Sequence, residues 1–438
     1  YVLTKVAVTV YAGGLVFQQV FGIKELWGID FFWIAAIGLV VLTALYTIFG
    51  GMKSVLYTSV LQTPILLLGS LIILVLGFKE LGGWDEMMRV CGAVTVNDYG
   101  DTMTNLIRSN DDANFPWLGA LIGSAIIGFW YWCTDQFIVQ RVLSGKNEME
   151  ARRGTIFGAY LKLLPVFLFL IPGMIAFALH QKYIGAGGEG FLPMLANGTA
   201  NADAAFPTLV AKLLPAGVKG LVVCGILAAL MSSLASLFNS SAMLFTIDFY
   251  KRFRPETPEK KLVGIGQVAT VVIVILGILW IPIMRSVGDV LYTYLQDVQS
   301  VLAPGIAAAF LLGICWKRTS AQGGMWGLIA GMVIGLTRLG AKVYYSNAGE
   351  VADSTFKYLF YDMNWLFFCG WMFLFCIIVV IVVSLATKAP TAEKIQGLVF
   401  GTATKEQKAA TRASWNHWDI IHTVIILAIT GAFYWYFW

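Results

Sequence analysis

Long apolar stretches separated by shorter polar connections follow one another along nearly the whole chain. Eleven of these stretches approach the ~20 residues that a helix needs to cross a bilayer. We expect them at residues 3–22, 30–50, 55–78, 117–142, 154–181, 218–250, 262–284, 289–316, 322–345, 364–387 and 417–437. None shows the alternating pattern of a barrel strand, so the pattern predicts an all-α fold with eleven transmembrane helices.

Composition supports this prediction and excludes several classes of function. The 438 residues are 58% hydrophobic and 13% charged, against ~25% charged residues in a typical soluble protein. The net charge of +5 comes from basic residues in the connections, so no nucleic-acid partner is expected. The six cysteines and three histidines form no disulfide or metal pattern. Because no phosphate-binding loop or hydrolase motif is present, neither an ATP-driven pump nor an enzyme is expected.

The distribution of lysine and arginine predicts the orientation. Even-numbered connections are shorter and more densely basic, and the one after the sixth span carries Lys251, Arg252, Arg254, Lys260 and Lys261. Cytoplasmic loops carry such an excess, so the sequence predicts an N-terminus inside and a C-terminus, Trp438, outside the cell membrane. A bacterial inner membrane is the expected location.

Two connections carry patterns of their own. Residues 204–215 are expected to form a short amphipathic helix at the outer surface. Residues 388–416 read as a polar cytoplasmic linker with a short helix at 404–413.

The fourth span ends in an unusual run of side chains. Phe129-Trp130-Tyr131-Trp132 is followed at once by Cys133-Thr134-Asp135-Gln136 and, a turn later, by Gln140-Arg141. A charge within a span usually faces a partner or a wet cavity, and the aromatic rings suit a pocket for a flat, partly apolar ligand. An interfacial aromatic belt at a helix end is the alternative.

Three further groups of polar residues lie within spans. Lys162 is two turns into the fifth span, where it either extends to the inner surface or pairs, with Asp135 as an allowed partner. Ala229, Ser232, Ser233 and Ser236 share one helix face, which suits either helix packing or oxygen coordination of a small cation. Gln296 and Asp297 precede Pro304-Gly305, which suits either a broken helix lining a cavity or a kinked helix with a satisfied amide.

The order and length of several motifs identify a family resemblance over essentially the whole chain. The chain closely resembles the sodium/glucose cotransporters, which belong to the solute:sodium symporters. The resemblance is carried by Trp130-Tyr131-Trp132-Cys133-Thr134-Asp135-Gln136, Gly158-Ala159-Tyr160-Leu161-Lys162, Ile171-Pro172-Gly173-Met174, Phe206-Pro207-Thr208-Leu209 and Leu230-Met231-Ser232-Ser233-Leu234.

The resemblance implies a leucine-transporter-type fold of two inverted five-helix repeats. On that plan the chain begins at the third core helix, so we expect the first core helices to be missing and the sequence to be N-terminally incomplete. Residues 1–316 would then form the transporter core, and residues 317–438 the peripheral helices with the cytoplasmic linker 388–416.

The same resemblance assigns roles to individual residues. Tyr131 matches the aromatic that covers the sugar on its inner side, and Lys162 and Gln296 match sugar-contacting positions; Trp132, next to Tyr131, is counted with them. Ala229, through its carbonyl, and Ser232 and Ser233 match the half of the sodium site that this helix supplies. The resemblance therefore favours ion coordination over packing for this helix face.

The sequence departs from the family pattern at three positions. Gly128 stands where sugar-transporting relatives carry a polar side chain such as Asn or Thr, so one sugar hydrogen bond is expected to be missing or moved to water. Ser59 stands where many relatives have Asp, and Ala235 where relatives with a second sodium site have Ser. One coupled sodium ion is therefore expected.

The resemblance implies sodium-coupled symport of a neutral sugar or polyol by alternating access. Two alternatives stay open: a sodium symporter for another solute such as inositol, sialic acid, an amino acid or a vitamin, and a non-coupling sugar-gated channel or sensor. The expected partners are the small solute, sodium and the lipid bilayer, with no obligatory protein partner.

Overall fold

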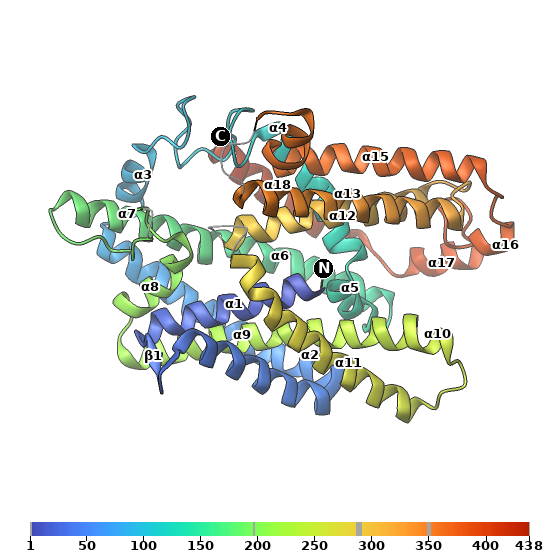
Figure 1. Cartoon of the computed structure of the whole chain (residues 1–438), viewed down its shortest axis with the longest axis horizontal. Helices are drawn as coiled ribbons and strands as arrows, with labels where there is room; N and C mark the ends of the chain where they lie inside the picture. The colour runs from blue at the N-terminus through green and yellow to red at the C-terminus, as the bar shows by residue number, and fades with distance from the viewer. Residues whose placement is uncertain (1, 196–197, 286–290, 348–351, 438) are drawn as a thin grey trace. The chain divides into compact units, whose positions relative to one another are not determined.

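The computed structural model describes residues 2–195, 198–285, 291–347 and 352–437, except for the side chains of residues 49–55, 283–285, 291–294 and 347. Trp438, the C-terminal residue that was predicted to lie outside the cell membrane, is not among the described residues. Within the described residues the chain is almost entirely helical (Figure 1). The predicted all-α class is therefore confirmed.

Ten helical segments of the described chain are long and apolar enough to cross a membrane. They are Phe31–Ile48, Leu56–Leu81, Trp117–Thr134, Glu148–Gly185, Ala216–Phe253, Glu259–Pro282, Leu295–Cys315, Ala321–Ser346, Trp365–Ala386 and His417–Tyr436. Each corresponds to an expected span. The eleventh expected span forms the 20-residue helix α1 (Val2–Phe21), which is not among the ten and carries the polar residues Lys5, Gln18 and Gln19.

The chain divides into two compact units. The first comprises Tyr1–Val96, Thr102–Thr104 and Leu163–Tyr292. Its elements are α1 (Val2–Phe21), β1 (Glu25–Leu26), β2 (Ile29–Asp30), α2 (Phe31–Leu81), α3 (Trp84–Gly92), η2 (Val166–Leu170), α7 (Ile171–Gly185), η3 (Ala202–Ala204), α8 (Ala205–Leu213), α9 (Ala216–Met243), η4 (Leu244–Tyr250), α10 (Lys251–Phe253) and α11 (Glu259–Arg285). α8 confirms the short helix expected within residues 204–215.

Small residues let α2 and α9 pack closely within the first unit. A Cβ atom on Gly69 would come within 2.8 Å of Val222, and one on Gly225 within 3.1 Å of Ile65. Membrane helices associate through such close contacts, because lipid provides no hydrophobic drive between them. α9 is thereby held firmly against the second half of α2.

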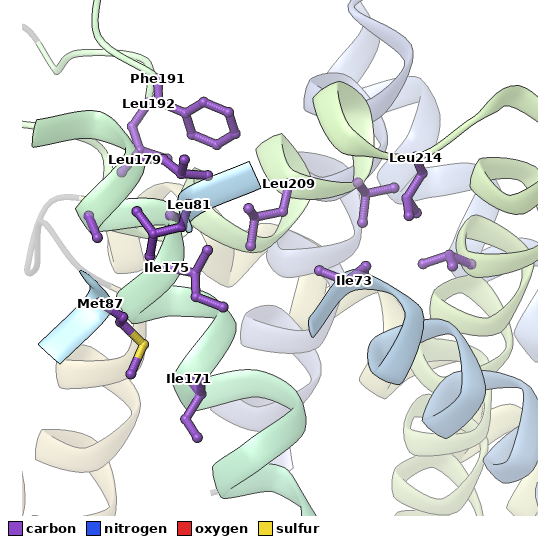
Figure 2. Packing of buried hydrophobic residues seen from close by; sticks show 14 of the residues in the cluster. Ile73, Leu81, Met87, Ile171, Ile175, Leu179, Phe191, Leu192, Leu209 and Leu214 are labelled. Atoms are coloured by element: carbon purple, nitrogen blue, oxygen red, sulfur yellow. The ribbon is translucent and has the colours of Figure 1, made fainter. Parts of the chain in front are cut away.

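A second packing centre joins α2, α3, α7 and α8. Figure 2 shows Ile73 and Leu81 of α2 together with Ile175 and Leu179 of α7 and Leu209 of α8. These five side chains are fully buried. The centre fixes the short helix α8 against the longer helices.

A two-residue β-hairpin, β1–β2, was not predicted from the sequence. Its turn is made by Trp27 and Gly28, which have φ angles of +56° and +75°. Two consecutive positive φ values define the turn type that suits the twist of a tight hairpin. Gly28 between apolar residues was the available signal.

The second unit comprises Asn97–Asp101, Asn105–Lys162 and Thr293–Trp438, so both unit boundaries within the later chain fall inside helices. Its elements are α4 (Trp117–Phe129), η1 (Trp130–Thr134), α5 (Gln136–Leu143), α6 (Glu148–Pro165, continuing past the boundary), α12 (Leu291–Cys315), α13 (Ala321–Asn347), α14 (Thr355–Lys357), η5 (Tyr358–Asp362), α15 (Trp365–Ala386), α16 (Ala392–Ile395), α17 (Lys405–Ala413) and α18 (His417–Tyr436). α17 confirms the helix expected at 404–413 and begins with a capping box at Thr404.

Glycines bring the helices of the second unit together as they do in the first. Gly305 of α12 and Gly331 of α13 face each other, and Gly327 of α13 lies against Val380 of α15. Of the two alternatives left open around Pro304-Gly305, the broken helix is excluded, because α12 runs without interruption from Leu291 to Cys315 and contains Pro304. The division between a core ending at residue 316 and peripheral helices after it stays a prediction.

Candidate functional site

The predicted substrate residues Gly128, Tyr131 and Trp132 lie where α4 loses its α-helical geometry. After Phe129 the chain forms the π-helical segment η1, and Asp135 then takes an extended conformation with φ −71° and ψ 116°. The Asp135 carboxylate accepts a hydrogen bond from the Phe137 amide at 3.1 Å and so caps α5. The expected continuous span over 117–142 is therefore interrupted at Asp135.

The break explains the unusual sequence of this stretch. A π turn frees backbone carbonyls from their usual partners, and such turns are frequent at functional sites. The Thr134 hydroxyl donates to the Trp130 carbonyl at 2.8 Å, and the Asp135 amide donates to the same carbonyl at 3.0 Å. The polar run is thus used locally to end one helix and begin the next.

The three aromatic rings of η1 form a wall, and their solvent exposure increases from Trp130 to Trp132. Trp130 is fully buried, Tyr131 is half-buried and Trp132 is exposed. The rings of Tyr131 and Trp132 meet edge to face, with centroids 5.3 Å apart and an interplanar angle of 88°. Edge-to-face contact holds both rings in defined orientations. The wall therefore has a fixed shape on which a flat ligand face can stack.

Lys162 of α6 contacts this wall. Its Nζ lies 5.6 Å from the centroid of the Trp132 ring, within the range of a cation–π interaction. The expected alternative, an ion pair with Asp135, is absent although both side chains are described. The Asp135 carboxylate accepts the hydrogen bond that caps α5. The structure thus brings Lys162 to the aromatic residues and not to the carboxylate.

Gly128 borders open space. A Cβ atom added there would meet no atom within 4 Å, whereas one added at Gly123, further up the same helix, would lie 2.8 Å from the Leu366 carbonyl oxygen. Gly123 is therefore required for packing against α15, and Gly128 is not. The absence of a side chain at Gly128 leaves room beside the aromatic wall.

Gln296 of α12 is half-buried, and among the described residues no hydrogen bond or ring contact joins it to Tyr131, Trp132 or Lys162. Its neighbour Asp297 is held firmly. The Asp297 carboxylate lies 2.6 Å from the Lys342 ammonium and 3.6 Å from the Arg338 guanidinium, both on α13. These ion pairs fix the turn of α12 that carries Gln296.

Arg338 was missed by the sequence reasoning. It is 1% exposed, donates to the Met363 carbonyl at 2.8 Å and lies 4.0 Å from the centroid of the Phe368 ring. A lone arginine in the middle of an apolar span, together with an aspartate in the preceding span, was the signal that could have revealed the pair.

The predicted sodium residues lie on α9 in the first unit. Ala229, Ser232 and Ser233 are partly buried, and the helix is regular around them. The Ser232 hydroxyl lies 2.6 Å from the Ser59 hydroxyl of α2. Within the described residues no hydrogen bond of the Ser233 hydroxyl is observed. Ser233 is therefore the hydroxyl of this stripe that remains open to a ligand.

The chemistry of this stripe fits a small monovalent cation. Hydroxyl and carbonyl oxygens are hard, neutral ligands, and no cluster of three or more His, Cys, Asp or Glu side chains able to hold a metal occurs in the described part of the chain. A neutral oxygen set compensates one positive charge better than two. Three positions on one helix are too few for full coordination, so further oxygens must come from another segment.

A polar loop of the second unit, before α4, is organised by two carboxylates. Asn97 donates to both Asp101 and Asp112, at 2.7 and 3.1 Å. The Asn114 and Phe115 amides donate to Asp112, which also lies 3.6 Å from Arg108. Burial raises the pKa of Asp112, but these donors and the Arg108 charge outweigh it, so its pKa is below the ordinary value. The loop is thus stabilised by ionised carboxylates.

The comparisons with known proteins decide the family. The model of the sodium:solute symporter family matches residues 1–331. A sodium/mannose cotransporter from Bos taurus is 35% identical over 457 residues, covering 100% of this chain and 75% of that protein. This chain belongs to the sodium:solute symporter family.

Other relatives and a solved structure agree with this assignment. A sodium/myo-inositol cotransporter 2 from Homo sapiens is 35% identical and a sodium/glucose cotransporter 1 from Ovis aries 36% identical, and the chain spans 60% of the length of each. A Na+-coupled sialic acid symporter, solved in a substrate-bound outward-open state, is similar with a TM-score of 0.63 at 20% identity, over 89% of this chain and 75% of that one. The leucine-transporter-type fold class is confirmed, and sodium is the coupling ion of the family.

Proposed function

We propose that this chain is part of a sodium-coupled symporter for a neutral sugar or polyol, which moves its substrate unchanged and uses the sodium gradient as its source of energy. The observation that carries the proposal is the fixed aromatic wall of Tyr131 and Trp132 beside the open space at Gly128. The apolar face of a sugar ring stacks on such a wall, while its hydroxyls need polar partners. Relatives that transport mannose, myo-inositol and glucose support this substrate class.

In this proposal the predicted residues divide into two sets. Tyr131, Trp132, Lys162, Gln296 and the space at Gly128 contact the substrate. The Ala229 carbonyl and the Ser232 and Ser233 hydroxyls coordinate one sodium ion. Sodium binding favours the outward-open state, and the helices then move to release both solutes inward. Each charge that moves gains ~2.3 kcal/mol per 100 mV of membrane potential.

A second candidate substrate class is a small anionic solute. Lys162 supports it, because its ammonium lies 5.6 Å from the centroid of the Trp132 ring and, among the described residues, forms no ion pair with a carboxylate. A symporter for such a solute would lose its anion preference in a Lys162→Gln variant, whereas uptake of a neutral sugar would only weaken.

Uptake by proteoliposomes tests the proposal. A panel of labelled sugars, polyols and sialic acid is offered with an inward sodium or potassium gradient. We expect sodium-driven accumulation of at least one neutral member, and loss of that accumulation in Ser233→Ala. Ser241→Ala is the matched control, because its hydroxyl donates to the Leu237 carbonyl within α9. Equilibration without accumulation would indicate the non-coupling channel, and unchanged uptake by Ser233→Ala would refute the sodium assignment.

We also propose that the N-terminus faces the cytoplasm and the C-terminus the outside of the cell membrane. The basic connection from Lys251 to Lys261 supports this orientation, since such connections stay on the cytoplasmic side. A protease-sensitive tag after the last residue should be cleaved on intact cells, and protection of that tag would reverse the assignment.

A further inference from the structure

A groove of about 740 Å³ lies in the second unit between the beginnings of α6 and α18 and the end of α17. Figure 1 labels the three helices. The walls include Glu148 and Arg152 at the start of α6, Trp415 after α17, and Asp419 at the start of α18. Residues deeper along the same two helices, among them Ile156 and Val424, complete it. None of these residues belongs to the proposed sodium or substrate sets.

Along both α6 and α18, the residues that line the groove change from charged at the start of the helix to apolar further along it. On α6 the groove passes from Glu148 to Arg152 and then, one turn further on, to Ile156. On α18 it passes from Asp419 to Val424. Both helices belong to membrane-crossing segments that begin at these charged ends. The groove is therefore charged at the membrane boundary and apolar toward the bilayer interior. An amphipathic molecule with the polarity of a lipid matches this gradient, whereas a sugar or a metal ion does not.

The charges at the groove mouth are of both signs and are open to a ligand. Within the described residues, neither Glu148 nor Arg152 makes a hydrogen bond or an ion pair, although they lie four residues apart on one helix. Asp419 is partly engaged, because one of its oxygens accepts from the Asn416 amide in the capping box of α18. Arg152 can therefore bind an anionic group, and Glu148 a cationic group beside it.

The packing of α18 indicates what a bound lipid would do. None of its residues is buried in the structure, and a hydrogen bond of 3.0 Å between Tyr160 of α6 and His422 attaches it to its neighbour. The groove lies next to this attachment. A molecule with apolar chains in the groove would cover surfaces of α6 and α18 that otherwise lack a protein partner.

We propose that this groove is a specific site for a zwitterionic phospholipid with a primary amine, of the phosphatidylethanolamine type. Arg152 binds the phosphate and Glu148, assisted by Asp419, accepts hydrogen bonds from the ammonium. The acyl chains lie along Ile156 and Val424. A choline headgroup has no N–H to donate to the carboxylates, and a glycerol headgroup has no cation to pair with them.

Lipid retention by the purified protein tests the site. The protein is exchanged into detergent containing phosphatidylethanolamine, phosphatidylcholine or phosphatidylglycerol of equal chain length, and bound lipid is counted by native mass spectrometry. We expect preferential retention of phosphatidylethanolamine. Arg152→Gln should weaken retention of this lipid about tenfold, as loss of a charge-assisted hydrogen bond does. Glu148→Gln should leave a lipid bound but reduce the preference for ethanolamine over choline to about one.

Adjacent residues provide matched controls. Arg153→Gln and Glu150→Gln remove the same charges from the same helix turn without altering the groove wall, and they should retain the lipid as the unaltered protein does. A third variant, Thr155→Phe, fills the groove with a ring and should lower retention of every phospholipid. Equal retention of all three lipids, a preference for phosphatidylglycerol, or equal effects of Arg152→Gln and Arg153→Gln would each overturn the proposal.

Discussion

The hydroxyl oxygens of Ser59 on α2 and Ser232 on α9 lie 2.6 Å apart. This contact joins α2 to the stripe on α9 that is proposed to bind sodium. The Ser232 hydroxyl is already hydrogen-bonded, whereas among the described residues no hydrogen bond of the neighbouring Ser233 hydroxyl is observed. Substitution of Ser59 and substitution of Ser233 should therefore have different effects on sodium-driven uptake.

Ser59→Ala should retain sodium-driven uptake. The variant loses one hydrogen bond, worth about 1 kcal/mol, and releases the Ser232 hydroxyl. We expect a two- to threefold change in the sodium concentration for half-maximal uptake, against complete loss in Ser233→Ala. Thr63→Ala is the control, because the Thr63 hydroxyl donates to the Ser59 carbonyl within the same helix. Loss of uptake in Ser59→Ala would make Ser59 itself a sodium ligand.

Gly128→Asn should improve sugar uptake without loss of stability. The new side chain enters open space, and in a helix asparagine is as favourable as glycine to within ~0.5 kcal/mol. An added sugar hydrogen bond should lower the half-saturating substrate concentration about fivefold. Thermal unfolding and uptake are measured together. Gly123→Asn, whose Cβ would meet the Leu366 backbone, should unfold at a lower temperature, and a similar loss in both variants would contradict the difference in packing.

Lys162→Gln should raise the half-saturating concentration of a neutral sugar by about two- to fivefold. The cation–π contact with Trp132 is at an exposed position, where such contacts contribute ~0.5–1 kcal/mol. Lys162→Arg keeps a cation over the ring and should restore affinity. Lys146→Gln, in the connection before α6, controls for overall charge. If Lys162→Arg and Lys162→Gln have equal effects, the cation–π contact with Trp132 does not contribute to the affinity for the sugar.

Asp297→Asn should be strongly destabilising. It leaves the fully buried Arg338 without its counter-charge, and breaking a buried pair costs about 3–5 kcal/mol. Lys342→Gln should cost less, although Lys342 is the nearer partner at 2.6 Å, because Lys342 is partly exposed. Asp353→Asn breaks an exposed pair with Lys357 and should leave the melting temperature nearly unchanged. The order of the three melting temperatures is the measurement, and equal shifts would refute it.

The polar loop around Asp112 should lose its order in acid. The folded-state pKa of Asp112 is below the ~3.9 of an unfolded chain, so its stabilisation is complete above about pH 4 and is lost as the pH falls through the lowered value. Hydrogen exchange of the Asn114 and Phe115 amides, corrected for intrinsic rates, should lose protection below that range. Asp112→Asn should show weak protection at every pH, and protection that persists in acid would exclude the ionised carboxylate as its source.

The sequence predicted the helices well because bilayer thickness imposes a length and a composition on each span. It identified the polar run after Trp132 but still predicted one continuous span over 117–142, because a polar run within a span does not show that the backbone leaves the helix at Asp135. Asp135 was identified as a polar group in a span, but its role as a helix cap depends on a backbone angle. Of the two alternatives for Lys162, the ion pair with Asp135 is not observed among the described residues.

The candidate site was only partly accessible from the sequence. The serine stripe follows from helix periodicity, but whether each hydroxyl is free depends on α2, which lies 173 residues away at the Ser59–Ser232 contact. Arg338 shows the same limit. Its partners Asp297, Met363 and Phe368 come from three separate segments, and only folding brings them together.

The π turn from Trp130 to Thr134 has a consequence for changes in chain length. A π turn holds one residue more than the α turn it replaces, and it absorbs that residue locally. A one-residue deletion within this turn would therefore alter the aromatic wall and leave the helices on either side in register. The same deletion inside α4 would rotate every following side chain by about 100°. In the substrate site proposed above, the loss of a single codon here would thus change the wall that faces the substrate without repacking the surrounding helices.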